Sequence, residues 1–171
     1  MIFVFWVVVA LTGATIHRWR DKQSRSHERT LEIYLLWWLV VALGLAGVVG
    51  GLYHLFDGKD IAEQIGYTRG DGGFQDEVGF GDLAIGTIGF LCIWFRGNFW
   101  LAVLIAAAIA LWGDAYGHLH QEAVNDNHDP DNTGAVLYYD ILVPLIGLVL
   151  YALLTRARGG RSAERAAPQS A

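Results

Sequence analysis

Five ionisable residues stand inside otherwise apolar stretches of this sequence and are the first candidates for chemistry. They are His54, Asp82, Asp114, His118 and Asp140. A charged side chain at the centre of a membrane span costs about 2.5 to 3.5 kcal/mol on insertion scales, so it normally pairs, reaches water or binds an ion. Asp114 and His118 are four residues apart, which puts both on one side of a helix within reach of one ion. The pattern predicts one common site for an ion or a proton.

A transition metal is the first interpretation of this site, because mixed imidazole and carboxylate ligands suit Zn, Fe, Mn or Cu. The chain has a single cysteine, Cys92, which excludes a cage of several thiolates. We expect Asp82, Asp114 and His118 to bind the metal. The residues that could complete its coordination are His54, Glu77 and Asp140. A metal with an open position could activate water or oxygen, which would make the protein a membrane-embedded hydrolase or oxidoreductase.

Further polar residues are expected around the same site. Gln75 and Tyr116 could support it through hydrogen bonds, and His120 would lie with Glu77 at its mouth. Each of these residues, taken alone, is also explained as a structural or interfacial residue. The convergence of four apolar segments on one place is therefore the stronger signal.

Other functions would use the same residues. A transporter or channel component would exchange protons or a cation there, but the inner halves of the apolar segments carry almost no polar residues to continue the path. A b-type haem subunit would use His54 and His118 as axial ligands. An accessory subunit would use the cluster only to hold helices together. The sequence does not decide whether the protein is an enzyme.

The composition indicates which elements carry these residues. The chain has 171 residues, of which 54% are hydrophobic and 17% charged, whereas a soluble domain carries about 25% charged residues. The apolar residues form runs of about 20, the length that crosses a bilayer as a helix. We predict an all-α integral membrane protein of one domain with five transmembrane helices. These lie at about residues 1–16, 31–54, 78–95, 99–119 and 135–155, and a disordered cytoplasmic tail follows at 156–171.

Small residues mark the faces on which these helices would pack. Lipid is as apolar as leucine, so membrane helices associate where small residues allow close approach. Such residues recur at intervals of three and four, for example Gly44, Gly47 and Gly51 in the second segment. We therefore expect segments two to five to form a bundle, each with an ionisable residue on its packing face. The first segment has no such residue and is expected at the periphery.

Basic residues predict the orientation in the membrane. Ten of the twelve Lys and Arg residues lie in residues 17–30, at Arg96 or in the tail, whereas the loops at 55–77 and 120–134 are acidic. Because Lys and Arg next to membrane spans stay in the cytoplasm, the N-terminus is expected outside and the C-terminus inside the plasma or inner membrane. The lipid bilayer is then the main partner, and a net charge of −5 without a basic face argues against nucleic acid. Binding to a second copy or to another membrane subunit stays open.

Short motifs follow one another within residues 74–147. They are Glu77-Val78-Gly79-Phe80-Gly81 continuing into Asp82-Leu83-Ala84-Ile85-Gly86, then Gly117-His118, Asn132-Thr133-Gly134 and Tyr139-Asp140-Ile141-Leu142-Val143-Pro144. Together they resemble an uncharacterised family of small prokaryotic multi-pass membrane proteins. The resemblance implies a helical bundle in which these positions matter, and it carries no activity. That family has Asn where this chain has Asp82, so a second carboxylate beside Asp114 would strengthen cation binding or leave one carboxyl protonated.

Overall fold

The long apolar runs form helices, which satisfy their backbone polar groups internally. The computed structural model describes residues 2–23, 26–67 and 72–166. Its helices are α1 (Ile2–Arg20), α2 (His27–Trp37), the π-helix η1 (Trp38–Leu45), α3 (Ala46–Gln64), α4 (Gly72–Leu91), α5 (Asn98–Asn125), α6 (Pro130–Thr133) and α7 (Ala135–Ala166). These ranges contain no strand, as the prediction of an all-α fold requires.

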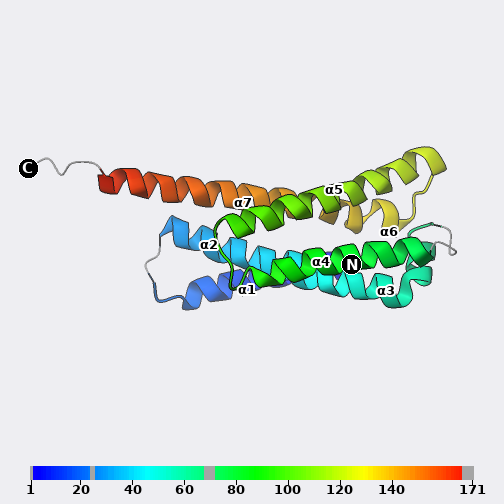
Figure 1. Cartoon of the computed structure of the whole chain (residues 1–171), viewed down its shortest axis with the longest axis horizontal. Helices are drawn as coiled ribbons and strands as arrows, with labels where there is room; N and C mark the ends of the chain where they lie inside the picture. Colours follow the sequence, from blue (N-terminus) through cyan, green and yellow to red (C-terminus); the bar gives the residue numbers. More distant parts are fainter. Residues whose placement is uncertain (1, 24–25, 68–71, 167–171) are drawn as a thin grey trace, which may run out of the picture.

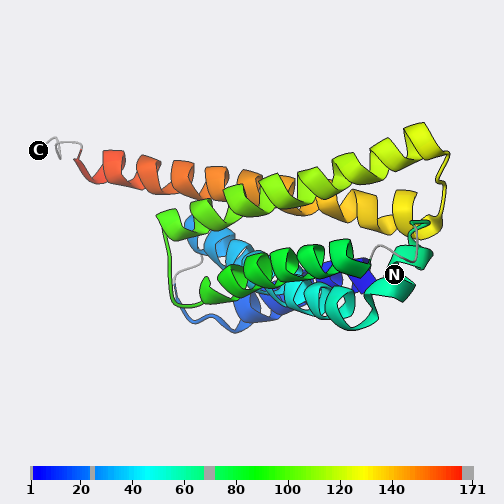
Figure 2. The same cartoon turned by 45° about the vertical axis from the view of Figure 1, so that its right-hand side comes forward.

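Five long helical rods lie alongside one another: α1, the α2–η1–α3 rod, α4, α5 and α7 (Figures 1 and 2). Successive rods run in opposite directions, so α1 runs toward the same end of the bundle as α7 (Figure 1). We call the end that holds residues 55–67 and 126–134 the acidic end. The other end, which holds residues 17–23 and 92–97, is the basic end.

Three helices are long and apolar enough to cross a membrane, namely His27–Gln64, Asn98–Asn125 and Pro130–Gly160. The prediction of five spans is not met, because the described parts of α1 and α4 do not combine this length with this apolarity. α1 ends in a basic sequence, and α4 carries three carboxylates, at Asp76, Glu77 and Asp82. These segments contain enough apolar residues to suggest a span, but their charged residues lower the mean hydropathy of the whole helix.

Large apolar side chains cover the outside of the rods, including the two that do not qualify as spans. Phe80 on α4 is 66% exposed and Ile109 on α5 is 73% exposed, and α1 exposes Phe5 and Val8. A surface of this extent and chemistry is typical of a face that contacts lipid or another apolar partner. Together with the three candidate spans, it indicates a helical protein in contact with a lipid bilayer.

The helix ends differ from the predicted segment ends. α3 extends to Gln64, but its backbone is non-helical at Asp57 (φ −121°, ψ 22°), so the helix is kinked three residues beyond the predicted segment end at residue 54. α7 continues to Ala166, so residues 156–166 are helical rather than the start of a disordered tail. Residues 167–171 lie outside the described part of the chain, as do Arg25, Arg69 and Asp71.

Glycines allow the α2–η1–α3 helix and α4 to touch backbone to backbone. A Cβ atom added at Gly86 would lie 2.5 Å from Val48 N and 2.8 Å from Gly44 O, and one added at Gly51 would lie 2.6 Å from Gly79 O. Real Cβ atoms do not approach backbone atoms so closely, so only glycine fits at these positions. The prediction that glycine stripes mark packing faces is confirmed for these two helices.

α1 joins the bundle, although the sequence placed it at the periphery. It contacts α2, η1 and α7, and its Ala10 and Ala14 are buried. Phe3 packs against Tyr139 of α7, with ring centroids 4.9 Å apart. The prediction treated ionisable residues as the sign of a packed helix, but small and aromatic side chains are sufficient for packing.

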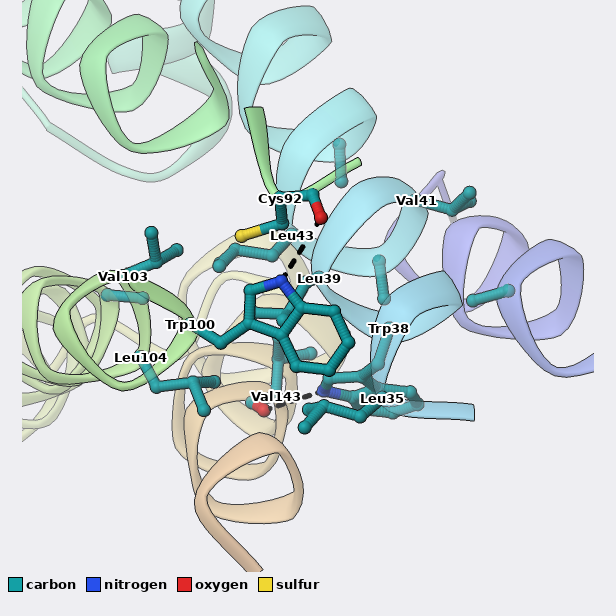
Figure 3. Packing of buried hydrophobic residues seen from close by; sticks show 14 of the residues in the cluster. Leu35, Trp38, Leu39, Val41, Leu43, Cys92, Trp100, Val103, Leu104 and Val143 are labelled. Carbon is teal, nitrogen blue, oxygen red and sulfur yellow. Dashed lines mark hydrogen bonds between the residues drawn. The ribbon is translucent and has the colours of Figure 1, made fainter. Parts of the chain in front are cut away.

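An apolar core fills the middle of the bundle and its basic half (Figure 3). Trp38 and Trp100 lie at its centre, packed with Leu39 and Leu104. Their indole groups have acceptors: Trp38 Nε1–H donates to the carbonyl of Val143 over 2.9 Å, and Trp100 Nε1–H donates to a carbonyl over 3.1 Å. A buried indole N–H needs such a partner, so these two bonds fix the orientation of both rings.

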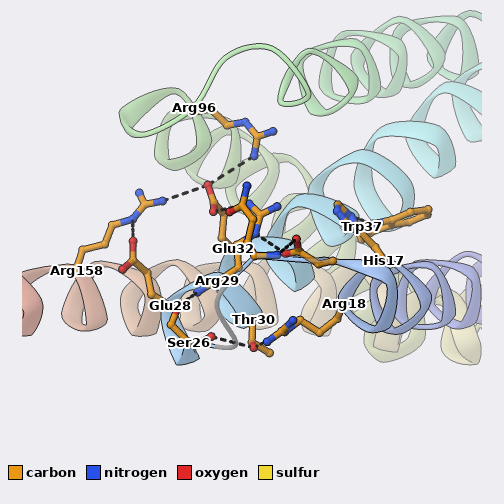
Figure 4. A network of polar contacts seen from close by, with 12 residues as sticks. His17, Arg18, Ser26, Glu28, Arg29, Thr30, Glu32, Trp37, Arg96 and Arg158 are labelled. Carbon is orange, nitrogen blue, oxygen red and sulfur yellow. Dashed lines mark hydrogen bonds and ion pairs between the residues drawn. The ribbon is translucent and has the colours of Figure 1, made fainter.

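Ion pairs tie separate segments together at the basic end (Figure 4). Glu32 on α2 lies 3.0 Å from Arg29, 3.9 Å from Arg96 and 3.5 Å from Arg158, and Arg158 also pairs with Glu28 at 3.4 Å. Single exposed pairs stabilise little, but this network joins α2 to the α4–α5 connection and to α7. It gives a physical reason why α7 remains helical beyond the predicted span.

Gly86→Ala should lower the free energy of unfolding by about 1 to 3 kcal/mol, because the added methyl group overlaps the backbone of the neighbouring helix. The measurement is the unfolding midpoint of the purified protein in detergent micelles. Gly81→Ala is the matched control on the same helix, since a Cβ atom there meets no atom within 4 Å. Equal midpoints for the two variants would contradict the packing described above.

Candidate functional site

A cavity of about 480 Å³ lies at the acidic end, lined by residues of α1, η1, α3, α4, α5, α6 and α7. The lining includes all five ionisable residues that the sequence placed inside apolar segments: His54, Asp82, Asp114, His118 and Asp140. Among the described residues that line it there is no Lys and no Arg. The site therefore gathers carboxylates and imidazoles without a fixed positive charge.

α3 and α4 supply one histidine–aspartate pair. His54 Nε2 lies 3.9 Å from Asp82 Oδ2, and His54 Nδ1 lies 2.7 Å from Gln75 Oε1. Gln75 is only 1% exposed, and a Cβ atom at Gly58 would lie 2.8 Å from its Cβ atom. Gly50 gives room to the carboxylate, since a Cβ atom there would lie 3.4 Å from Asp82 Oδ2. The glycines of α3 thus create the space that the polar side chains of α4 occupy.

α5 and α7 supply a second pair with the same pattern. His118 Nε2 lies 3.7 Å from Asp140 Oδ2, and His118 Nδ1 lies 2.8 Å from Asn132 Oδ1. His118, Asn132 and Asp140 are all buried. Asn132 Nδ2 donates to the carbonyl oxygens of His118 and Asn127 over 3.2 and 3.0 Å. In both pairs an amide oxygen lies against Nδ1 of the histidine while a carboxylate faces Nε2.

The amide of Asn132 determines where the proton of His118 resides. Because Asn132 Nδ2 donates two hydrogen bonds, Oδ1 is the acceptor and Nδ1 of His118 carries the hydrogen. A neutral imidazole would then present the lone pair of Nε2 to Asp140 Oδ2 at 3.7 Å. Two acceptors that face each other repel, so the pair is stabilised by a proton or by a nearby cation.

Asp114 is the carboxylate inside the long helices that faces no histidine in a pair; Asp131 on α6 also lines the cavity but is exposed. Asp114 lies one turn before His118 on α5 and has no hydrogen bond or ion pair among the described residues. The hydroxyl of Tyr67 comes near the same turn, 3.9 Å from the position of a Cβ atom at Gly117. Burial, together with the negative charge of Asp114, raises the pKa of the Tyr67 phenol.

Residues that the sequence placed at the mouth or in support of the site do not all reach the cavity. The residues outside its lining are Glu77, Tyr116 and His120. Each is two positions beyond a lining residue, at Gln75, Asp114 and His118, and two positions correspond to about 200° around a helix. All three are exposed, and the rings of Tyr116 and His120 pack against each other with centroids 6.0 Å apart. Gln75 does lie where the sequence placed a supporting hydrogen bond.

The arrangement does not support the expected metal centre. Among the described residues, no group of three or more His, Cys, Asp and Glu side chains is placed to hold one metal ion. The ionisable side chains are instead arranged as two pairs and one separate carboxylate. Asp82, Asp114 and His118 therefore share a cavity without converging on one point.

Sequence analysis missed the aromatic part of the cavity. The aromatic residues in its lining are Phe3, Trp6, Tyr53, Tyr67, Phe74 and Tyr139. It also missed the role of Asn132, which holds His118 in place. The motif Asn132-Thr133-Gly134 is the signal for this residue in the sequence, but the asparagine is not ionisable and lies between two apolar segments rather than inside one.

The chain matches a family of unknown function (DUF6790) over residues 1–160 and belongs to that family. The expectation of an uncharacterised family is thereby confirmed, and the match covers more of the chain than residues 74–147. No curated protein and no solved structure matches the chain. Any statement about function consequently depends on the chemistry of the cavity.

Asn132→Ala should lower the free energy of unfolding by about 1 to 3 kcal/mol, since it leaves buried donors and acceptors without partners. Thermal unfolding in micelles measures the effect. The control is Asn125→Ala, which removes an exposed asparagine from the end of α5. If Asn132→Ala were no less stable than Asn125→Ala, the hydrogen-bond network around His118 would not be as described.

Proposed function

We propose that this protein is an integral membrane protein that binds a cation in the cavity at its acidic end. The observation that carries the proposal is the balance of charge in the lining, which has four aspartates (Asp82, Asp114, Asp131 and Asp140) and, among the described residues, neither Lys nor Arg. Carboxylates in apolar surroundings are strongly disfavoured unless they are neutralised or paired. The site is therefore complete only when protons or a cation supply the missing positive charge.

The two histidine–aspartate pairs support a coupling between the cation and protons. Each pair is stable with a proton on Nε2 or on the carboxyl, as argued above for His118 and Asp140. A second positive charge that enters the cavity repels that proton, because like charges repel at short range in a medium of low dielectric constant. The cation and the protons of the pairs therefore compete for the same carboxylates.

The apolar core favours entry and exit at the acidic end. Trp38, Leu39, Trp100 and Leu104 fill the bundle beyond the cavity and offer no polar path toward the basic end. The alternative function, a proton- or cation-coupled transporter or channel component, uses the same site but also needs this core to open. A cation-binding protein that exchanges with one side of the membrane requires no such rearrangement.

A transition metal or a haem group, which needs direct coordination by protein ligands, fits this arrangement less well than a cation attracted by the negative charge of the aspartates. Zn and the related metals take three or more protein ligands in most sites, whereas each pair here offers two. Haem needs a free imidazole nitrogen at the iron, but Nε2 of both His54 and His118 faces an aspartate. Both cofactors remain predictions of the sequence that the experiment below also tests.

The charge distribution also supports an orientation for the protein. Arg29, Arg96 and Arg158 lie at the basic end, and Lys and Arg beside membrane helices stay in the cytoplasm (Figure 4). In this orientation the acidic end, the cavity and the N-terminus face the outside, and the C-terminus is cytoplasmic. The bound cation then comes from outside the cell or from the periplasm.

Purified protein should gain thermal stability with at least one cation from a panel of Na⁺, Ca²⁺, Mn²⁺, Zn²⁺, haem iron as hemin, and benzyltrimethylammonium. Asp114→Asn should weaken that binding about tenfold or more, since it removes the unpaired carboxylate while keeping its shape. Asp126→Asn, in the exposed loop after α5, is the control and should bind as the wild type does. A protein that gains stability with no member of the panel, or an Asp114→Asn variant that responds fully, would refute the proposal.

A further inference from the structure

The cavity is too large for a bare inorganic ion. Its volume is about 480 Å³. Pockets for small organic ligands occupy about 300 to 1,000 Å³, whereas one water molecule takes about 30 Å³ of the liquid. An inorganic ion would fill a small part of this space, and no group of three described ligands is placed to hold one. The size points to a ligand with several non-hydrogen atoms.

The lining is mostly apolar and rich in aromatic rings, which indicates the kind of body such a ligand has. Tyr53, Tyr67 and Phe74 lie at the acidic end of the cavity, and Phe3 and Tyr139 lie together deeper in it. The hydroxyl of Tyr139 donates to the carbonyl of Ala42 in the π-helix, so it is already satisfied and the ring contributes apolar surface. The faces of aromatic rings attract cations, most strongly where water is excluded.

The carboxylates differ in how available they are to a ligand. Asp82 and Asp140 each face a histidine, and Asp140 is only 4% exposed without a hydrogen bond among the described residues. Asp131 on α6 also lines the cavity, but it is exposed, and water and salt screen an exposed charge. Asp114 is less exposed, faces no histidine in a pair and lies beside Tyr67, whose hydroxyl reaches the same turn of α5. A positive group in the cavity would therefore find its counter-charge at Asp114 and an aromatic ring next to it.

We propose that the cavity binds a small organic ammonium ion with an apolar body, its charged nitrogen paired with Asp114 and its carbon groups against the aromatic side chains. This inference rests on the proposed function, because it names the class of cation. Among the described lining residues there is no Lys or Arg to pair with a phosphate, and four aspartates repel one. A phospholipid headgroup, which carries a phosphate beside its ammonium group, is accordingly not the ligand.

Binding is measured by isothermal titration with phenethylamine and benzyltrimethylammonium as probes and with 2-phenylethanol as the neutral analogue of phenethylamine. We expect saturable binding of at least one of the two cations. The affinity for 2-phenylethanol should be lower by about tenfold or more. Asp114→Asn should remove this preference for the charged probe. An equal affinity for phenethylamine and 2-phenylethanol, or an unchanged preference in Asp114→Asn, would overturn the inference.

A second variant tests whether the ligand occupies the cavity. Gly117 lines it, and a Cβ atom there would meet only the Tyr67 hydroxyl, at 3.9 Å, so Gly117→Leu adds a side chain to open space. This variant should lose organic cation binding about tenfold or more, while Gly81→Leu, on the outer face of α4, should bind as the wild type does. Equal affinities in the two leucine variants would overturn the inference.

The outcome also separates this inference from the proposed function on which it rests. Binding of an inorganic cation but of neither organic probe would overturn the inference and leave the cation site in place. Binding of no cation at all would overturn both. If Gly117→Leu does not fold, the isosteric Asp114→Asn variant and the neutral analogue still test whether the cavity binds an organic ammonium ion.

Discussion

A carboxylate among apolar helices needs a counter-charge, and this requirement organises the acidic half of the molecule. The protein places no Lys or Arg in the described lining of the cavity and meets the requirement in part with histidines, each facing one aspartate at 3.7 to 3.9 Å. The amide oxygens of Gln75 and Asn132 hold the other nitrogen of each ring. Asp114 is left without such a partner, which makes the cavity receptive to a positive charge.

The two halves of the bundle differ in how tightly their helices pack. In the basic half, tryptophan and leucine side chains fill the space between helices and a network around Glu32 joins the ends of the segments. In the acidic half, glycines bring α3 and α4 together on one side while the α5–α7 pair stands apart enough to leave the cavity. Because the basic half is packed and anchored, the rods can hold ionisable side chains at the other end in fixed positions.

The sequence was a good guide to which residues share the cavity. A charge inside an apolar run is conspicuous, and helical periodicity places Asp114 and His118 on one face, so their convergence followed from elementary geometry. The same logic failed for Glu77, Tyr116 and His120, because a shift of two residues turns a side chain to the far side of its helix. Distance along the chain from a lining residue is thus a poor measure of distance from the cavity.

Other features depend on packing that a single sequence does not display. The part of α1 in the cavity could not be predicted from charge, since Phe3 and Trp6 carry none. The number of candidate spans was overestimated because the second half of α4 is apolar beyond Asp82 while its first half carries carboxylates. The metal centre was inferred from ligand types alone, and whether ligand atoms converge on one point depends on side-chain directions.

The most direct test of the account is whether water reaches Asp114 from the acidic end of the membrane-embedded protein. Asp114→Cys can be treated in proteoliposomes with a charged methanethiosulfonate reagent, which modifies thiols in contact with water. The native Cys92 is buried, and Ile109→Cys, 73% exposed on the outer face of α5, reports a position facing lipid. Asp114→Cys should react with reagent added at the acidic side only, and Ile109→Cys should not react. An Asp114→Cys variant as inert as Ile109→Cys, or one modified from the basic side, would contradict the account.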